Sequence, residues 1–285
     1  LIAELMSRAM RIELDAPCKP GLVDPSGNGA HTDMDYRLMK GSIDVIRRSF
    51  ISHLPMILPT LAPGLIAFGK AIEEDVLEYT GGVNTYRGAI FSIGLTAVAC
   101  LILCDPHHAA LLNACGGQVV DNQLNNHNDP GKNGGVVVGN IFIDNDLSAT
   151  AKCLSEVISI LAGGIAAAQD DRALRQAQGR NHDDTLVQRT LLRIMSQLDD
   201  TCVIHRVGYD RAQEVKKEAT VLLEALKNPG KLESQENFVS EEALGKEGFQ
   251  ESLEAMKGKY DREGISPGGA ADMLALTVFI DSLLT

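Results

Sequence analysis

Apolar stretches with helical spacing alternate in this chain with short polar segments rich in glycine and proline. Four of these segments stand out, at residues 19–35, 81–88, 200–208 and 266–272. Each combines residues that permit unusual backbone or close approach to a ligand with side chains that handle charged groups. No other part of the chain is as dense in such chemistry. The pattern predicts helices whose connecting loops converge on one site.

The composition favours an all-α fold. Hydrophobic residues make up 45% of the chain, Trp is absent and aromatic residues are only 4%. The core must therefore be built from Leu, Ile, Val, Ala and Met, which fill packed helices. No Pro/Ser-rich linker divides the 285 residues. We therefore expect a single multi-helix domain over residues 1–285.

Charge and hydropathy argue against two classes of partner. The formal net charge is -12, and neutralising a nucleic-acid backbone requires clustered Lys and Arg. The longest apolar run, residues 89–104, contains polar interruptions and falls short of the roughly 20 residues that a membrane span needs. We expect no nucleic-acid or membrane partner, and a buried helix at this run.

The six cysteines show no CxxC spacing, and several lie in apolar helical context. Such cysteines are typical of buried thiols in a reducing compartment. We therefore expect a cytoplasmic protein.

Periodicity predicts the remaining elements. Residues 37–78 are predicted to form two helices, because prolines interrupt the pattern, and the last helix should have Ser266 at its N-cap position and Pro267 at N1. The Asn/Gly-rich residues 113–145 are compatible with a loop or a small hairpin. Further helices are predicted at residues 1–14, 147–178, 183–204 and 212–227, and a helical pair at 231–261.

The first polar segment contains the densest set of candidate ligands. Asp33 and Asp35 lie one residue apart and could jointly bind Mg2+, which prefers carboxylates together with substrate phosphates. The alternative is that both aspartates cap the following helix and that His31 is a hydrogen-bonded turn residue.

The other three segments suit anion binding, and each has a structural alternative. Asn84 and Arg87 precede a buried helix, whose N-terminus could receive a phosphate or be capped in the ordinary way. Asp199 and Arg206 are seven residues apart, so they would share one side of a continuous helix and could form an ion pair. Ser266 opens a glycine-rich helix start that suits an anion, a close helix crossing or a cap.

Taken together, the strings KPGLVD, GAHTDMD, GGVNT with RG, DDTCVIHR and SPGGAAD resemble, in this order, the triphosphoribosyl-dephospho-CoA synthase family, which serves citrate lyase and malonate decarboxylase. The resemblance implies an all-helical, ATP-binding pentosyltransferase. Its reaction passes the triphosphoribosyl group of ATP to the ribose 2'-hydroxyl of 3'-dephospho-CoA and releases adenine. It also implies Mg2+ with the ATP, delivery of the product to a carrier-protein holo-synthase, and a homodimer as one option.

The resemblance transfers a set of site residues onto this chain. The candidates for catalysis are His31, Asp33, Asp35 and Asp200, of which Asp33 and Asp35 would also hold the metal. Breaking an N-glycosidic bond builds positive charge on the ribose, which carboxylates stabilise, and His31 or His205 could protonate adenine. The expected substrate-binding residues are Lys19, Asn84, Thr85, Arg87, His205, Arg206, Ser266, Gly268, Gly269 and Asp272.

Two departures from the family pattern leave alternatives open. Tyr86 and Arg87 stand where the family usually has His and Lys, and no Gly-x-Arg-Gly-Glu segment precedes the third motif. A catalytically weak or inactive nucleotide-binding relative is therefore the competing hypothesis. A metal-dependent helical phosphohydrolase is a third, and it would release phosphate and leave adenine on the ribose.

Overall fold

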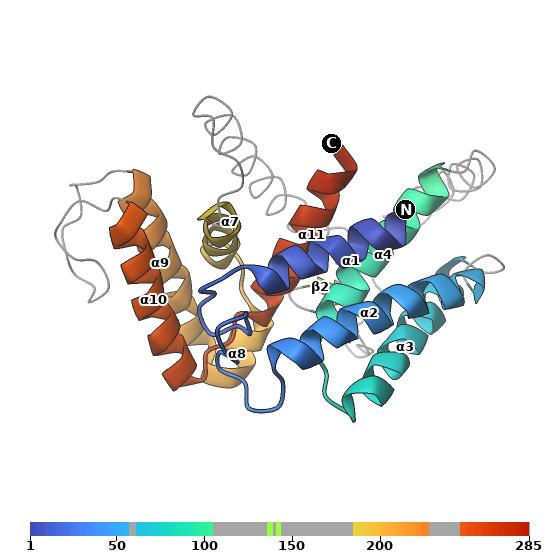
Figure 1. Cartoon of the computed structure of the whole chain (residues 1–285), viewed down its shortest axis with the longest axis horizontal. Coiled ribbons are helices and arrows are strands. Elements are labelled where there is room, and N and C mark those ends of the chain that lie inside the picture. The colour runs from blue at the N-terminus through green and yellow to red at the C-terminus, as the bar shows by residue number, and fades with distance from the viewer. Residues whose placement is uncertain (57–60, 105–135, 139–140, 144–184, 228–245, 285) are drawn as a thin grey trace, which may run out of the picture.

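The computed structural model of this chain is built almost entirely from helices (Figure 1). It describes residues 1–56, 61–104, 136–138, 141–143, 185–227 and 246–284. The elements are α1 (Ile2–Asp15), α2 (Tyr36–His53), the 3-10 turn η1 (Leu54–Met56), α3 (Leu61–Thr80), α4 (Arg87–Cys104), β1 (Val136–Val138), β2 (Ile141–Ile143), α7 (Thr185–Met195), α8 (Thr201–Val207), α9 (Tyr209–Lys227), α10 (Lys246–Glu263) and α11 (Gly268–Leu284). The all-α prediction is confirmed.

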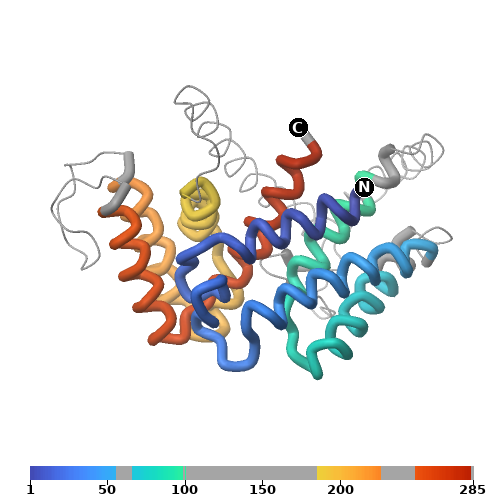
Figure 2. Tube along the Cα trace, viewed as in Figure 1, coloured from blue at the N-terminus to red at the C-terminus, as the bar shows by residue number. Residues whose placement is uncertain are grey.

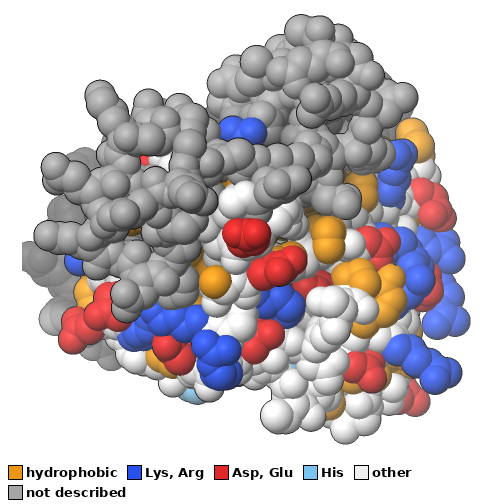
Figure 3. All heavy atoms as spheres, turned by 60° about the vertical axis from the view of Figure 1, so that its left-hand side comes forward, with side chains coloured by type: hydrophobic (Ala, Val, Ile, Leu, Met, Phe, Trp, Pro, Cys, Tyr) orange, Lys and Arg blue, Asp and Glu red, His pale blue; other side chains and the backbone are white. Residues whose placement is uncertain are grey.

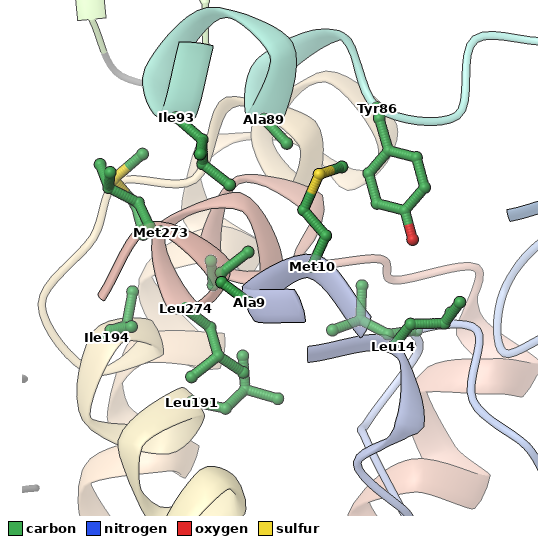
Figure 4. Close-up of a cluster of buried hydrophobic side chains, with 14 of the residues drawn as sticks. Ala9, Met10, Leu14, Tyr86, Ala89, Ile93, Leu191, Ile194, Met273 and Leu274 are labelled. Carbon is green, nitrogen blue, oxygen red and sulfur yellow. The ribbon is translucent and has the colours of Figure 1, made fainter. Parts of the chain in front are cut away.

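The core forms where α1 packs against α2 and α11, with α4 and α7 also against α11. Buried residues recur every three or four positions along α1, the spacing of one helical face. Figure 4 shows Ala9 and Met10 of this face beside Ile93 of α4 and Leu274 of α11. Burying a large apolar side chain contributes about 1.5–3 kcal/mol. This packing fixes the helix ends that carry the polar segments.

Most predicted helices are present where the structure describes the chain. Residues 37–78 do form two helices, joined near the prolines. The hairpin alternative holds for part of residues 113–145, because Val137 of β1 pairs with Phe142 of β2 in an antiparallel register. The predicted helix at 147–178, most of the 113–145 stretch and residues 231–245 of the predicted pair lie outside the described residues. The single-domain prediction stays a prediction.

The prediction of one helix over residues 183–204 was wrong. α7 ends at Met195 and α8 begins only at Thr201. The Asp200 side chain accepts hydrogen bonds from the backbone N–H groups of Cys202 and Val203 and thereby caps α8. An aspartate at this position competes with helical continuation. As a consequence, Asp199 bonds to Lys216 at 2.7 Å, and no pair with Arg206 forms.

The polar segments lie at one end of the helices. In Figure 2 the loop after α1, the turn between α3 and α4, and α8 follow the lower side of the molecule. Gly21 lets the first loop lie against the segment that leads into α11. Its φ is +69°, and an added Cβ would lie 1.8 Å from the Ile265 carbonyl oxygen. The loop therefore closes on α11 only with glycine there.

Surface charge on the described residues is mixed in sign. Figure 3 shows acidic and basic side chains interspersed on one face. Among the described helices, none has the length and apolar character needed to cross a membrane.

Candidate active site

A cavity of about 270 Å³ lies where the four polar segments meet. The end of α1 contributes Glu13 to its wall, and Tyr86, the residue before α4, also lines it. Nine of the residues predicted for the site line it: His31, Asp33, Asn84, Thr85, Arg87, Arg206, Ser266, Gly268 and Asp272. Five do not: Lys19, Asp35, Asp200, His205 and Gly269. The structure therefore brings segments from both halves of the sequence to one pocket.

His31 connects three of the segments. Its Nε2 lies 2.8 Å from the Ser266 hydroxyl. Its Nδ1 lies 3.3 Å from Arg206 Nη2 and 3.5 Å from Asp33 Oδ1. Burial and the Arg206 charge lower the pKa of His31, and Asp33 only partly opposes them. The ring is therefore neutral near pH 7, and its chief visible contribution is to join the loop to α8 and α11.

The two aspartates of the first segment separate. Asp35 caps α2, because its Oδ1 accepts the backbone N–H of Leu38 at 2.7 Å. It lies outside the cavity, beside a second, more open hollow that also contains Arg37 and Tyr79. Asp33, whose side chain is 58% exposed, faces the cavity. The capping alternative thus describes Asp35, and its position does not support the expected catalytic and metal-binding roles. Where residues are described, no three potential metal ligands gather.

Lys19 does not reach the cavity. Its side chain is 1% exposed, and its Nζ donates to the Glu13 carbonyl oxygen at 2.7 Å and to Glu13 Oε1 at 2.5 Å. The ammonium group is therefore bonded to Glu13, and its position does not support the expectation that it binds substrate. Glu13 itself lines the cavity and was missed by the sequence analysis. The available signal was an acidic residue on the apolar face of α1.

The second segment presents both capped and unpartnered groups. Asn84 Oδ1 accepts the backbone N–H of Arg87 at 3.2 Å, so the ordinary cap is present. Arg87 lies at the cavity edge, 57% exposed, and its Nε is 3.1 Å from Glu73 Oε1. The hydroxyl groups of Thr85 and Tyr86 are buried and have no partner in the described chain. A buried hydroxyl without a partner is costly, which points to a ligand or water in the cavity.

Asp200 joins α8 to α11. It is buried, and besides capping α8 it accepts the Ala270 backbone N–H at 2.8 Å. Gly269 gives the carboxylate room, since an added Cβ would lie 3.0 Å from Asp200 Oδ1. Burial raises the pKa of Asp200, while these backbone N–H groups oppose the increase. Asp200 and Gly269 therefore have a structural role, and Asp200 rather than Ser266 caps α11.

The remaining residues of α8 differ in their access to the cavity. His205 is exposed and outside it. Cys202 lines it, but desolvation and the neighbouring Asp200 charge raise the pKa of its thiol to about 12. A protonated thiol is a poor nucleophile. The cavity therefore offers carboxyl groups and arginines for chemistry, and no activated cysteine.

Asp272 occupies a recess that only glycine permits. A Cβ on Gly88 would lie 1.9 Å from Asp272 Oδ2. The carboxyl group accepts the Ala89 backbone N–H at the start of α4, which lowers its pKa slightly. Desolvation and the charges of Glu13 and Asp200 dominate, and they raise the pKa of Asp272 well above its usual range. Burial therefore favours the protonated form of Asp272.

A pocket with buried carboxyl groups inside, arginines at its edge and a helix N-terminus in its wall is typical of a helical enzyme that acts on an anionic substrate. The chain belongs to the CitG family, whose model is described as ATP:dephospho-CoA triphosphoribosyl transferase and matches residues 1–126 and 165–285. The unmatched residues, 127–164, include part of the Asn/Gly-rich stretch that has no counterpart in the family motifs.

Relatives with matching names are similar to this chain over nearly its whole length. A Pectobacterium atrosepticum protein named "2-(5''-triphosphoribosyl)-3'-dephosphocoenzyme-A synthase" is 30% identical, over 97% of this chain and 87% of its own length. A Stutzerimonas stutzeri protein named "Probable 2-(5''-triphosphoribosyl)-3'-dephosphocoenzyme-A synthase" is 29% identical, over 99% of this chain and 91% of its own. No solved structure matches significantly.

Proposed function

We propose that this cavity carries out the reaction that defines the family. The chain is a pentosyltransferase that moves the triphosphoribosyl group of ATP to the ribose 2'-hydroxyl of 3'-dephospho-CoA and releases adenine. The observation that carries the assignment is the convergence of family motifs from both halves of the chain on one carboxyl-lined cavity. Its carboxyl groups suit a transition state with positive charge on the ribose.

The triphosphate is not cleaved in this reaction, so it serves as a handle that orients the ribose. Arg206 and Arg87 are the cations of the cavity wall, and guanidinium groups bind phosphate oxygens bidentately. Lys19 and His205 have no part in this, because neither lines the cavity. The arginines at the edge of the cavity would therefore bind the triphosphate. The reacting ribose would lie in the interior of the cavity.

In the first experiment, the protein is incubated with ATP, Mg2+ and 3'-dephospho-CoA, and the products are measured by chromatography and mass spectrometry. We expect free adenine and a triphosphoribosyl adduct in equal amounts. Binding of ATP with neither product would instead identify a nucleotide-binding relative without activity. Phosphate release with adenine retained on the ribose would identify a phosphohydrolase.

Mg2+ would reach the site with the triphosphate, and Asp33 would be its protein ligand. Mg2+ commonly binds through one or two carboxylates plus substrate phosphates, and Asp33 is the member of the aspartate pair that lines the cavity. The ion would neutralise phosphate charge beside the two arginines.

Asp33→Asn and Asp35→Asn form a matched pair for this assignment. We expect Asp33→Asn to raise the Mg2+ concentration required for half-maximal activity by about tenfold or more. Asp35→Asn should leave it unchanged, because Asn caps helices as well as Asp does. Equal Mg2+ dependence in the wild type and both variants, measured by adenine release, would contradict a metal-binding role for Asp33.

The product would then pass to the holo-synthase of a carrier protein in the cytoplasm. A triphosphoribosyl adduct of dephospho-CoA is a precursor of a prosthetic group, so a second enzyme must attach it. A homodimer remains part of this proposal, with sedimentation as its direct measurement.

A further inference from the structure

Two carboxyl groups inside the cavity have no part in binding the triphosphate. Glu13 comes from the end of α1 and Asp272 from the first turns of α11, and both line the cavity. They are close enough for the Glu13 charge to raise the pKa of Asp272. Two interacting carboxyl groups in different surroundings commonly divide the roles of acid and base.

Glu13 is the member of the pair that has a cation. Its Oε1 receives a hydrogen bond from Lys19 Nζ, and the two side chains are 3% and 1% exposed. Burial raises the pKa of Glu13, whereas the Lys19 charge and hydrogen bond oppose the rise. The ammonium group stabilises the carboxylate form, so Glu13 is the group that can accept a proton.

Asp272 has no cation among the described residues that contact it. The Ala89 N–H is the one group that favours its charged form, while Glu13, Asp200 and desolvation disfavour it. The surroundings of Asp272 therefore favour its protonated form, whereas Glu13 has an ammonium group that favours its charged form. A buried carboxylic acid of this kind can donate a proton to a leaving group.

We propose that Glu13 is the base that removes the proton from the acceptor 2'-hydroxyl and that Asp272 is the acid that protonates the departing adenine. This inference rests on the proposed function. The bond between C1 of the ATP ribose and adenine N9 breaks, and its electron pair leaves with adenine, which takes the Asp272 proton. The acceptor oxygen bonds to C1, and its proton goes to Glu13. Exchange with solvent restores both groups.

Tyr86 supports the presence of a ligand between these groups. Its hydroxyl is buried and unpartnered in the described chain, and it is close enough to Glu13 and Asp272 for both charges to raise its pKa. Figure 4 shows the ring beside Met10, with the hydroxyl directed toward the end of α1. A phenol there can donate a hydrogen bond to a sugar oxygen without titrating at neutral pH.

The two roles predict a bell-shaped pH profile for kcat. Activity should increase as Glu13 loses its proton and decrease as Asp272 loses its own. The other groups whose charges act on the pair are Lys19 and Asp15 for Glu13, and Asp200 for Asp272. Asp33, Arg87 and Arg206 also line the cavity. Asp200, which is buried and held by backbone N–H groups, is present in every variant below.

Glu13→Gln and Asp272→Asn keep the shapes and remove one titration each. We expect kcat to fall by about 10²–10⁴-fold in each, with the KM for ATP changed only a few-fold. Glu13→Gln should lose the acidic limb of the profile and Asp272→Asn the alkaline limb. Glu13→Asp, which restores a carboxylate, should recover part of the activity with the acidic limb intact. If the pH profile of Glu13→Gln or of Asp272→Asn keeps both limbs, the role assigned to the substituted residue is wrong.

An altered leaving group separates the acid from a merely structural residue. ATP methylated at adenine N7 releases neutral 7-methyladenine, which needs no proton. With this substrate Asp272→Asn should approach the wild-type rate, while Glu13→Gln stays slow. Equal slowness of both variants would overturn the proposal for Asp272. Adduct formation by the wild type in the same assay tests the proposed function separately, and thermal unfolding reports whether each variant folds.

Discussion

Lys19→Met is expected to destabilise the fold by about 3–5 kcal/mol, because it removes one partner of a buried ion pair and leaves the other charge uncompensated. Lys19 and Glu13 are 1% and 3% exposed, so water cannot replace the lost contact. The ammonium group also binds the Glu13 carbonyl oxygen near the end of α1. Urea unfolding at pH 7 measures the change, and the variant should also lose activity because Glu13 is no longer held.

The loss of stability in Lys19→Met should increase with pH. Burial already raises the pKa of Glu13, and losing Lys19 removes the opposing charge. A carboxyl group whose pKa is raised on folding favours the folded state while protonated, so that stability is full below its unfolded pKa, roughly pH 4. It is lost as pH increases through the folded value. The deficit of Lys19→Met relative to wild type should therefore widen from pH 4 to pH 7.

The double variant Glu13→Gln with Lys19→Met is the control. It has no uncompensated charge, so most of the lost stability should return, as happens when both members of a buried pair are replaced. If the double variant is as unstable as Lys19→Met alone, the charge imbalance is not the cause of the loss.

Gly88→Ala should reduce kcat by about 10²-fold while leaving the protein folded. The added methyl group would lie 1.9 Å from Asp272 Oδ2, so the carboxyl group must move from its place at the start of α4. A displaced acid no longer meets the leaving group. Steady-state kinetics measure the effect, which should appear in kcat more than in the KM for ATP.

Gly94→Ala is the matched control on the same helix. Within the described chain, no atom lies within 4 Å of a methyl group added at this position. The variant should therefore gain up to about 1 kcal/mol of stability and keep wild-type activity. A Gly88→Ala variant with wild-type kcat would show that the position of Asp272 does not matter for the reaction.

Periodicity and capping rules predicted the elements well where they depend on local interactions. α11 begins at Gly268, one residue after the predicted N1 position at Pro267. Asp35 caps α2, which is one of the two interpretations that the sequence offered for this residue. The break between α7 and α8 was missed, because an apolar stripe continues through it. Asp200 starts α8 as a separate helix by a local capping hydrogen bond. The Asp200 side chain is also held by the backbone of α11, which is distant in sequence.

The sequence by itself determined the helical class, the family motifs and nine of the residues that line the cavity. Only the tertiary structure decided which charges face that cavity. Lys19 belongs to a motif, yet it lies behind the wall, while Glu13, on an ordinary amphipathic helix, lies in it. The reason is that helix formation follows from neighbouring residues, whereas the pairing and protonation of buried charges depend on groups that packing brings together from distant segments.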